Sequence, residues 1–294
     1  MKKGLTQFIL FCFILLFFGV IAVWFLQKPK EISTYDAARA YNDILFQTSL
    51  GPRLPGSQAH LDTIEYVVSE LTKAGWQVEL QQNERLGHPL TNIIARRGMG
   101  KQWVILGAHY DSRISADQDP DLNMRHLPVT GANDGASGVA VLLELARSLP
   151  QDLDREVWLV FFDLEDQGNQ EGWEWILGSR AFADSLEGKP DAVVIIDMIG
   201  DADLNLYREA NSDPQLTDQI WGLADELGYS SIFINSVKFS ILDDHLPFIE
   251  KGIPAIDIID FDYPYWHTVQ DTADKVSAQS LEVIGRVLHT WLTR

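Results

Sequence analysis

The sequence predicts an α/β fold in which helices cover both faces of a mixed, mainly parallel β-sheet, giving three layers. Short apolar runs alternate with longer segments of helical periodicity along most of the chain, a pattern typical of repeated strand–helix units. The runs are rich in Val and Ile and lack polar alternation, which indicates strands that are buried on both faces. No change of composition divides residues 31–294, so we expect a single domain there.

The first 30 residues differ from the rest and predict a membrane anchor. Residues 8–26 carry no charge, Lys2 and Lys3 precede them, and Trp24 lies near their far end. A helix of this length spans about 28 Å, close to the hydrocarbon thickness of a bilayer, and interfacial tryptophans are favoured. A signal peptide cleaved after Ala22 is the alternative, but apolar residues continue beyond that point. We expect a single-pass protein, with residues 1–30 as tail and anchor.

Composition excludes several classes of function. Of the 23 Lys and Arg residues four lie within the first 30 positions, so residues 31–294 carry 19 basic and 42 acidic side chains, a formal charge of −23. Such a surface repels phosphate backbones, which excludes nucleic acid as a partner. The single cysteine, Cys12, excludes an intrachain disulfide and a Cys-ligated zinc site. An acidic domain without cysteine fits the surface or periplasm of a bacterium, outside the cytoplasm.

Capping residues and apolar periodicity place the elements in order. Thr34 and Ser57 can cap two helices, over residues 35–48 and 57–74, which a loop at residues 51–56 separates. Strands are expected at residues 77–80, 92–95, 103–108, 157–162, 192–196 and 255–259. Further helices are expected at residues 139–149, 179–186, 216–227, 245–250 and 278–292.

Polar residues gather where these strands end and in the loop GANDGASG, residues 131–138. They are His109, Asp111, Asp134, Glu165, Asp166, Asp197 and His267. Taken alone, Asp134 can be explained as a helix cap and His267 as a structural histidine. Because the carboxyl ends of parallel strands meet at one edge of a sheet, where ligands bind, we expect these side chains to lie together.

This set of residue types suits zinc. Two imidazoles and three carboxylates offer the nitrogen and oxygen ligands that zinc binds at about 2.0–2.2 Å. Asp134 can bridge two ions, which leaves Glu165 free as the general base for a metal-activated water. Asp111, two residues after His109, can hold its imidazole in one tautomer. No HExxH motif occurs in the sequence, so the site is not that of a zincin.

The motifs GAHYDS, GANDGASG, FFDLED, DMIG and WHT resemble those of the M28 family of zinc aminopeptidases and the related glutaminyl cyclases, in order and spacing over residues 50–294. The resemblance implies the fold of the zinc aminopeptidases and one or two zinc ions. It implies that His109, Asp134 and Asp197 hold one ion, that Asp134, Asp166 and His267 hold the other, and that Glu165 shuttles protons. The family's aminopeptidases usually have Glu-Glu where this chain has Glu165-Asp166. Because the Asp166 side chain is one bond shorter, its carboxylate reaches less far toward the second metal position.

The resemblance leaves two reactions open. Asp243, in LDDHLPF, is similar to the cyclase residue that relays protons with Glu165 and Asp197, although it can also be explained as a helix cap. GANDGASG matches the hydrolytic members better. We therefore expect an aminopeptidase that acts on peptides with a free N-terminus, with glutaminyl cyclisation as the alternative. A non-catalytic receptor is less favoured, because every ligand position holds a competent residue.

Aromatic side chains near these positions predict a substrate pocket. We expect its walls among six aromatic residues: Trp173, Trp175, Phe261, Tyr263, Tyr265 and Trp266. Core packing is the alternative for Phe261 and for the pair in WEW. The alternating Asp117, Asp119 and Asp121 resemble the start of a calcium loop, but the glycine and glutamate of an EF-hand do not follow. We interpret that segment as a solvated acidic loop.

Overall fold

The computed structural model describes residues 35–294. The predicted membrane span at residues 8–26 and the predicted helix cap Thr34 lie outside the described residues. Among residues 35–294, no helix is both long and apolar enough to cross a membrane.

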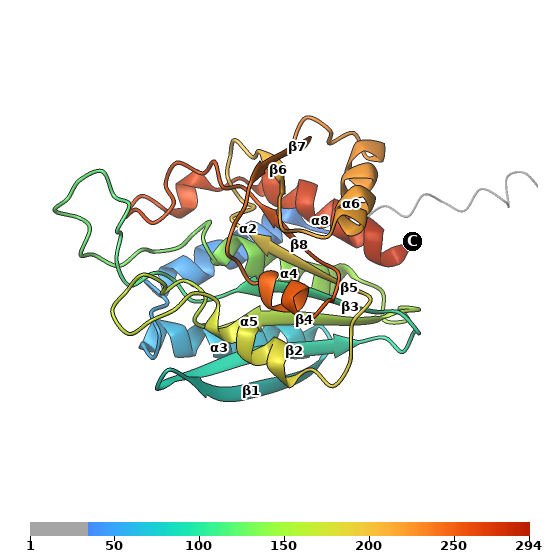
Figure 1. The fold of residues 1–294 in the computed structure, drawn as a ribbon, viewed down its shortest axis with the longest axis horizontal. Helices are drawn as coiled ribbons and strands as arrows, with labels where there is room; N and C mark the ends of the chain where they lie inside the picture. The colour runs from blue at the N-terminus through green and yellow to red at the C-terminus, as the bar shows by residue number, and fades with distance from the viewer. Residues whose placement is uncertain (1–34) are drawn as a thin grey trace, which may run out of the picture. The chain divides into compact units, whose positions relative to one another are not determined.

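Six strands form one mixed sheet in the order β1-β2-β4-β3-β5-β8 (Figure 1). The strands are β1 (Gln77–Arg85), β2 (His88–Arg97), β3 (Trp103–His109), β4 (Glu156–Phe162), β5 (Ala192–Asp197) and β8 (Ala255–Ile259). The four strands β4, β3, β5 and β8 are mutually parallel, whereas β1 and β2 pair in antiparallel fashion. The predicted mixed, mainly parallel sheet is therefore confirmed.

Helices bury both faces of this sheet. The helices are α2 (Ala37–Ser49), α3 (Gln58–Lys73), α4 (Ala136–Ser148), α5 (Leu177–Ser185), α6 (Pro214–Glu226), α7 (Leu246–Glu250) and α8 (Ala278–Thr293), with a 3₁₀ turn η1 (Ala273–Lys275). Val194 and Ile196 point into a core shared with α2, α3, α4, α6 and α8. Val193 and Ile195, on the opposite face, pack against Phe182 of α5 and Phe248 of α7. Successive residues of β5 therefore alternate between two faces that are both apolar. This explains the absence of polar alternation in the sequence.

The edge strands differ from the prediction. The strands expected at residues 77–80 and 92–95 extend into a longer hairpin, whose turn Leu86-Gly87 has positive φ at both residues, 54° and 82°. This turn geometry suits an antiparallel hairpin. A second, two-stranded parallel sheet, β6 (Leu206–Glu209) with β7 (Phe233–Phe239), was not expected. Most of β7 is exposed and lacks a continuous apolar run, so periodicity did not reveal it.

Helix caps explain where the first two helices begin. Asp36 caps α2, because its side chain accepts a hydrogen bond from the Arg39 N–H. Ser57 caps α3 through the N–H of His60, as predicted. The loop before α3 is fixed by the buried Arg53, whose guanidinium donates to the carbonyls of Tyr110, Thr130 and Gly131. These three carbonyls lie in the loops that carry the candidate site.

Candidate metal centre

Four parallel strands bring the candidate ligands to one edge of the sheet. His109 and Asp197 are the last residues of β3 and β5, and Asp166 follows the end of β4. Asp134 lies just before α4, and His267 lies in the loop after β8. All five side chains are buried. The structure therefore places them together, on the side where α/β sheets bind ligands.

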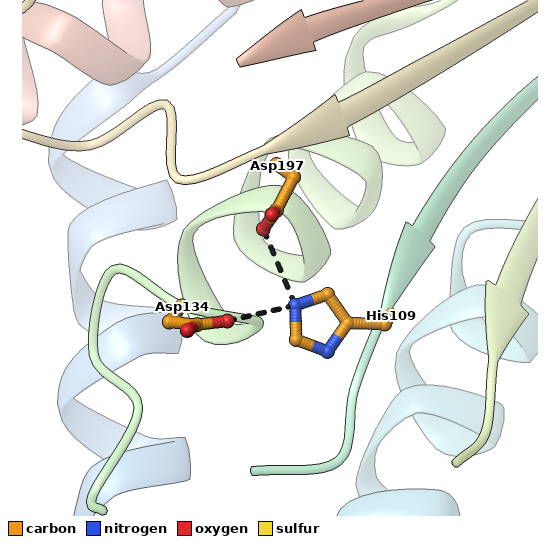
Figure 2. A group of neighbouring side chains, drawn as sticks. All are labelled: His109, Asp134 and Asp197. Atoms are coloured by element: carbon orange, nitrogen blue, oxygen red, sulfur yellow. Dashed lines mark hydrogen bonds and ion pairs between the residues drawn. The ribbon is translucent and has the colours of Figure 1, made fainter. Parts of the chain in front are cut away.

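These residues form two triads that share one carboxylate. His109 Nε2 lies 3.1 Å from Asp134 Oδ1 and 3.2 Å from Asp197 Oδ1 (Figure 2). His267 Nε2 lies 2.9 Å from Asp166 Oδ1 and 3.7 Å from Asp134 Oδ2. Within each triad the ligand atoms all lie within 4.8 Å of one another. Asp134 thus offers one oxygen to each triad, as a bridging carboxylate would.

The residues present fit zinc. Tetrahedral zinc with bonds of about 2.0–2.2 Å holds its ligand atoms about 3.3–3.6 Å apart, near the spacings found here. Two buried carboxylate oxygens of the described site, Asp134 Oδ2 and Asp166 Oδ2, have no hydrogen-bond partner. Buried polar atoms are normally paired. Both oxygens belong to carboxylates of the second triad, which is consistent with a place for a cation there.

The charges of the site also favour a cation. Burial raises the pKa of Asp197 to about 7, and burial together with Asp134 raises the pKa of Asp166 to about 6. Burial opposes protonation of His267, but Asp166, Asp117 and Asp134 outweigh it and raise its pKa to about 9. Negative charge is therefore in excess around both imidazoles, and a bound divalent ion would compensate it.

Asp111 and Glu165 lie beside the first triad. Asp111 Oδ1 is 3.4 Å from His109 Nδ1, and its carboxylate accepts hydrogen bonds from the Glu165 N–H and from Gln167 Nε2. Asp111 therefore orients the His109 ring and the loop that carries Glu165. Glu165 lines the cavity, and burial raises the pKa of its carboxyl well above the ordinary range. A carboxyl in this environment suits proton transfer.

Asp117 has a role that the sequence analysis missed. Its Oδ1 lies 3.1 Å from His267 Nδ1, and Arg113 donates to both of its oxygens at 2.8 Å. Asp119 accepts a hydrogen bond from the Val269 N–H. The interpretation of this segment as a solvated loop is therefore wrong for Asp117 and Asp119, because the loop packs against the one that carries His267. These contacts also engage oxygens that a calcium ion would need.

Backbone strain is concentrated at this edge. Leu164, Met198 and His267 all have positive φ, 52°, 45° and 54°. Non-glycine residues adopt this region infrequently, and it is often found at functional sites. Each of the three is a candidate ligand or lies within two residues of one. Neither the motifs nor the periodicity of the sequence carried a signal for this strain.

A cavity of about 210 Å³ opens beside both triads. Its aromatic walls are Trp175, Phe261 and Trp266. Trp173, Tyr263 and Tyr265, which we expected to be walls, are not among the lining residues. Trp173 instead stacks on His88, with ring centroids 3.5 Å apart, and Tyr265 packs edge-on against Tyr263 at 5.5 Å.

Asp243 lines the same cavity, together with Glu165 and Asp197. Its alternative interpretation as a helix cap is wrong: the residue that caps α7 is His245, and no side chain bonds to that helix end. The Asp243 carboxylate instead accepts from the Asp244 N–H. Asp134 is not a helix cap either, because the N-cap residue of α4 is Gly135.

Comparison with known proteins agrees with this geometry. A sequence model described as "Peptidase family M28" matches residues 92–292, more than half of the chain. The chain belongs to peptidase family M28. It is therefore an enzyme with the fold of the zinc-dependent peptidases of this family, as the motifs predicted.

Relatives of this M28 domain carry two kinds of name. A glutaminyl-peptide cyclotransferase of Boiga irregularis is 27% identical, over 82% of this chain and 76% of its own length. The structure of a Bacteroides thetaiotaomicron glutaminyl cyclase is 31% identical, with a TM-score of 0.84 over 88% of this chain and 98% of that chain. A Zn-dependent exopeptidase from Parabacteroides distasonis is also 31% identical, with a TM-score of 0.83 over the same shares.

The M28 match contains every residue of both triads and one buried carboxylate that the sequence analysis missed, Asp271. Its oxygens accept hydrogen bonds from the N–H groups of Asn133 and Asp134 at 2.9 and 3.1 Å, and from the Tyr263 hydroxyl at 2.7 Å. Asp271 therefore holds the backbone of the bridging residue. It lies in a polar stretch, TVQDTADK, without a pattern that could have revealed it.

Proposed function

We propose that this enzyme is a glutaminyl-peptide cyclotransferase, which converts an N-terminal glutamine into pyroglutamate. The observation that carries the proposal is the position of Asp243, whose carboxyl lines the cavity beside Glu165 and Asp197 instead of capping a helix. A third carboxyl at the reacting centre suits a reaction that must move a proton from an amine to a leaving ammonia. The cyclase names among the relatives support the same choice.

In this reaction the α-amine of the substrate attacks its own side-chain amide, so a C–N bond forms and the amide nitrogen leaves as ammonia. Glu165 would take the proton from the amine and deliver it to the leaving nitrogen. Asp134, Asp166 and His267 would hold a zinc ion, which when bound polarises the amide carbonyl. Trp175, Phe261 and Trp266 would exclude water and fold the side chain back, so that the amine rather than water is in line.

Aminopeptidase hydrolysis is the second candidate. The observation that favours it is that the first triad, His109, Asp134 and Asp197, is also complete and shares Asp134 with the second. Two adjacent ions suit activation of water for attack on a peptide bond. Both reactions act on peptides with a free N-terminus, and the acidic groups of the cavity can pair with an α-ammonium group.

The test is to incubate the purified chain and zinc with a Gln-initiated and a Leu-initiated peptide and to follow both by mass spectrometry. We expect the Gln-initiated peptide to lose ammonia and the Leu-initiated peptide to stay unchanged. Loss of a whole residue would show hydrolysis instead, and no change in either peptide would refute both candidates.

Two variants sharpen this test. Glu165→Gln should lower turnover about 10²–10⁴-fold while zinc stays bound, since a proton carrier is lost but no ligand. Asp243→Ser should lower cyclisation by a similar factor, whereas in an aminopeptidase the change would be mild. An active Glu165→Gln enzyme would contradict the assignment of the base.

A further inference from the structure

Glu209, at the end of β6, is a buried carboxylate outside the metal ligands that gathers an unusual number of donors. Its Oε1 accepts from Asn211 Nδ2 and the Ile241 N–H, at 2.8 and 2.9 Å. Its Oε2 accepts from the N–H groups of Asn211 and Ser212 at 2.8 Å and from the Ser212 hydroxyl at 3.0 Å. His245 Nε2 lies 3.1 Å from the same oxygen. This carboxylate therefore links three segments of the chain.

One of these segments is a wall of the cavity. Ser240, Ile241, Leu242 and Asp243 all line it. The ladder between β6 and β7 is irregular and ends with the pair Glu209 and Phe239, just before this wall begins. Beyond that pair, side chains bind the backbone of the wall: Glu209 accepts the Ile241 N–H, and Asn211 Nδ2 donates to the Ile241 carbonyl at 3.2 Å.

We propose that Glu209 is a positioning residue, which fixes the wall at residues 240–243 and thereby sets the affinity of the cavity for the N-terminal residue of the substrate. The inference rests on the proposed function only for its kinetic part. Glu209 accepts the Ile241 N–H directly, and it orients Asn211, which donates to the Ile241 carbonyl. Both polar groups of the Ile241 backbone therefore depend on Glu209. Asp243, two residues further on, depends on the same anchor for its place at the reacting centre.

A glutamine cannot replace this carboxylate. Donors face both oxygens of Glu209, so in either orientation the amide NH₂ group would meet N–H donors at one side. Buried donors left unpaired cost free energy, and we expect the wall to shift in response. An aspartate keeps two acceptor oxygens but has a shorter side chain. Glu209→Asp should therefore hold the wall better than Glu209→Gln, though less well than the wild type.

The matched control is Glu144 on α4, which is as deeply buried and equally well paired. Its carboxylate contacts Arg39 at 2.6 Å and Arg147 at 3.4 Å and accepts from the Asp36 N–H. It does not line the cavity. Glu144→Gln should therefore lower stability without changing the wall.

The experiment measures the full-length chain by hydrogen–deuterium exchange and by steady-state kinetics on the Gln-initiated peptide. In Glu209→Gln we expect faster exchange over residues 240–245, a KM raised about tenfold and, because Asp243 moves with the wall, a lower kcat as well. Glu144→Gln should show neither change. Unaltered exchange in Glu209→Gln, or the same rise in KM in Glu144→Gln, would overturn the inference. If the wild-type chain cyclises no peptide, the proposed function fails, while the exchange data still decide whether Glu209 fixes the wall.

Discussion

At the scale of single residues, the candidate centre depends on carboxylates outside the two triads. Asp111 faces His109, Asp117 faces His267, and Asp271 holds the backbone of Asp134. Each orients one ligand through an atom that does not point at the metal position. Such partners fix the tautomer and direction of a ligand, so their loss weakens metal binding even though no ligand is removed.

Asp117→Asn tests this dependence. The amide cannot serve both His267 Nδ1 and the two nitrogens of Arg113 that the carboxylate accepts from. We expect zinc affinity to fall about 10–100-fold, measured by titration against a competing chelator. Asp121→Asn, in the same loop but exposed, should leave the affinity unchanged. Equal affinities in all three proteins would show that Asp117 does not support His267.

The ligands could be predicted from the sequence because their types and their places at strand ends point to one edge of a sheet. Asp117 could not, because its partner His267 lies 150 positions away and only the folded chain joins them. Trp173 and Tyr265 were predicted as walls from their residue type and neighbours in sequence. Whether a loop side chain enters the core or the cavity depends on its direction. Loops have no repeating pattern from which that direction could be predicted.

At the scale of elements, the start of α4 depends on a glycine. Gly135 has a φ of +91°, and a Cβ there would lie 2.8 Å from the Asp111 carbonyl oxygen and 3.0 Å from His109 Cε1. Gly135→Ala should therefore lower the free energy of unfolding by about 1–3 kcal/mol and weaken zinc binding. Differential scanning calorimetry with and without zinc measures both effects.

Gly222→Ala is the matched control for that change. Gly222 lies within α6, and no atom is near the place of its Cβ. Alanine there should raise stability by roughly 0.5–1 kcal/mol, because it is the better helix former. A Gly135→Ala protein that is as stable as the Gly222→Ala protein would contradict the steric argument.

The junction of α3 with the end of β4 should make stability depend on pH. His60 Nε2 lies 2.7 Å from Asp163 Oδ1. Burial opposes protonation of His60, but the bond to Asp163 outweighs it and raises the pKa of the imidazole above its ordinary 6.5. Stability gained in this way is fully present below the unfolded pKa and is lost as pH rises through the folded one.

The stability difference between wild type and His60→Gln should therefore shrink, by on the order of 1 kcal/mol, between pH 6 and pH 9. Chemical denaturation at a series of pH values measures it. A difference that stays constant across this range would mean that the pKa of His60 is the same in the folded and the unfolded protein.

Elements with a strong apolar pattern could be predicted, and those without one could not. The strands β3, β4, β5 and β8 are buried on both faces, so their composition alone identifies them. The exposed second half of β1, beyond the predicted residues 77–80, and the whole of β7 owe their existence to pairing with β2 and β6. Pairing is a tertiary property, and it overrides weak local preference.

At the scale of the whole molecule, zinc should stabilise the fold. Its ligands come from β3, β5 and three loops, and their buried carboxyls repel one another without a cation. Zinc at about 1,000 times its dissociation constant should add about 4 kcal/mol. Removal by a chelator should therefore lower the melting temperature, and added zinc should restore it. A melting temperature that changes neither on chelation nor on addition of zinc would argue against a metal centre.

The distribution of the ligands along the chain has a consequence for biosynthesis. The triad of His109, Asp134 and Asp197 is complete once β5 has been made, whereas the triad with Asp166 also needs His267, 70 residues later. Chains are made from the N-terminus and fold as domains, so the two half-sites become available in a fixed order. The second triad therefore cannot form until the segment after the last strand of the sheet has been made.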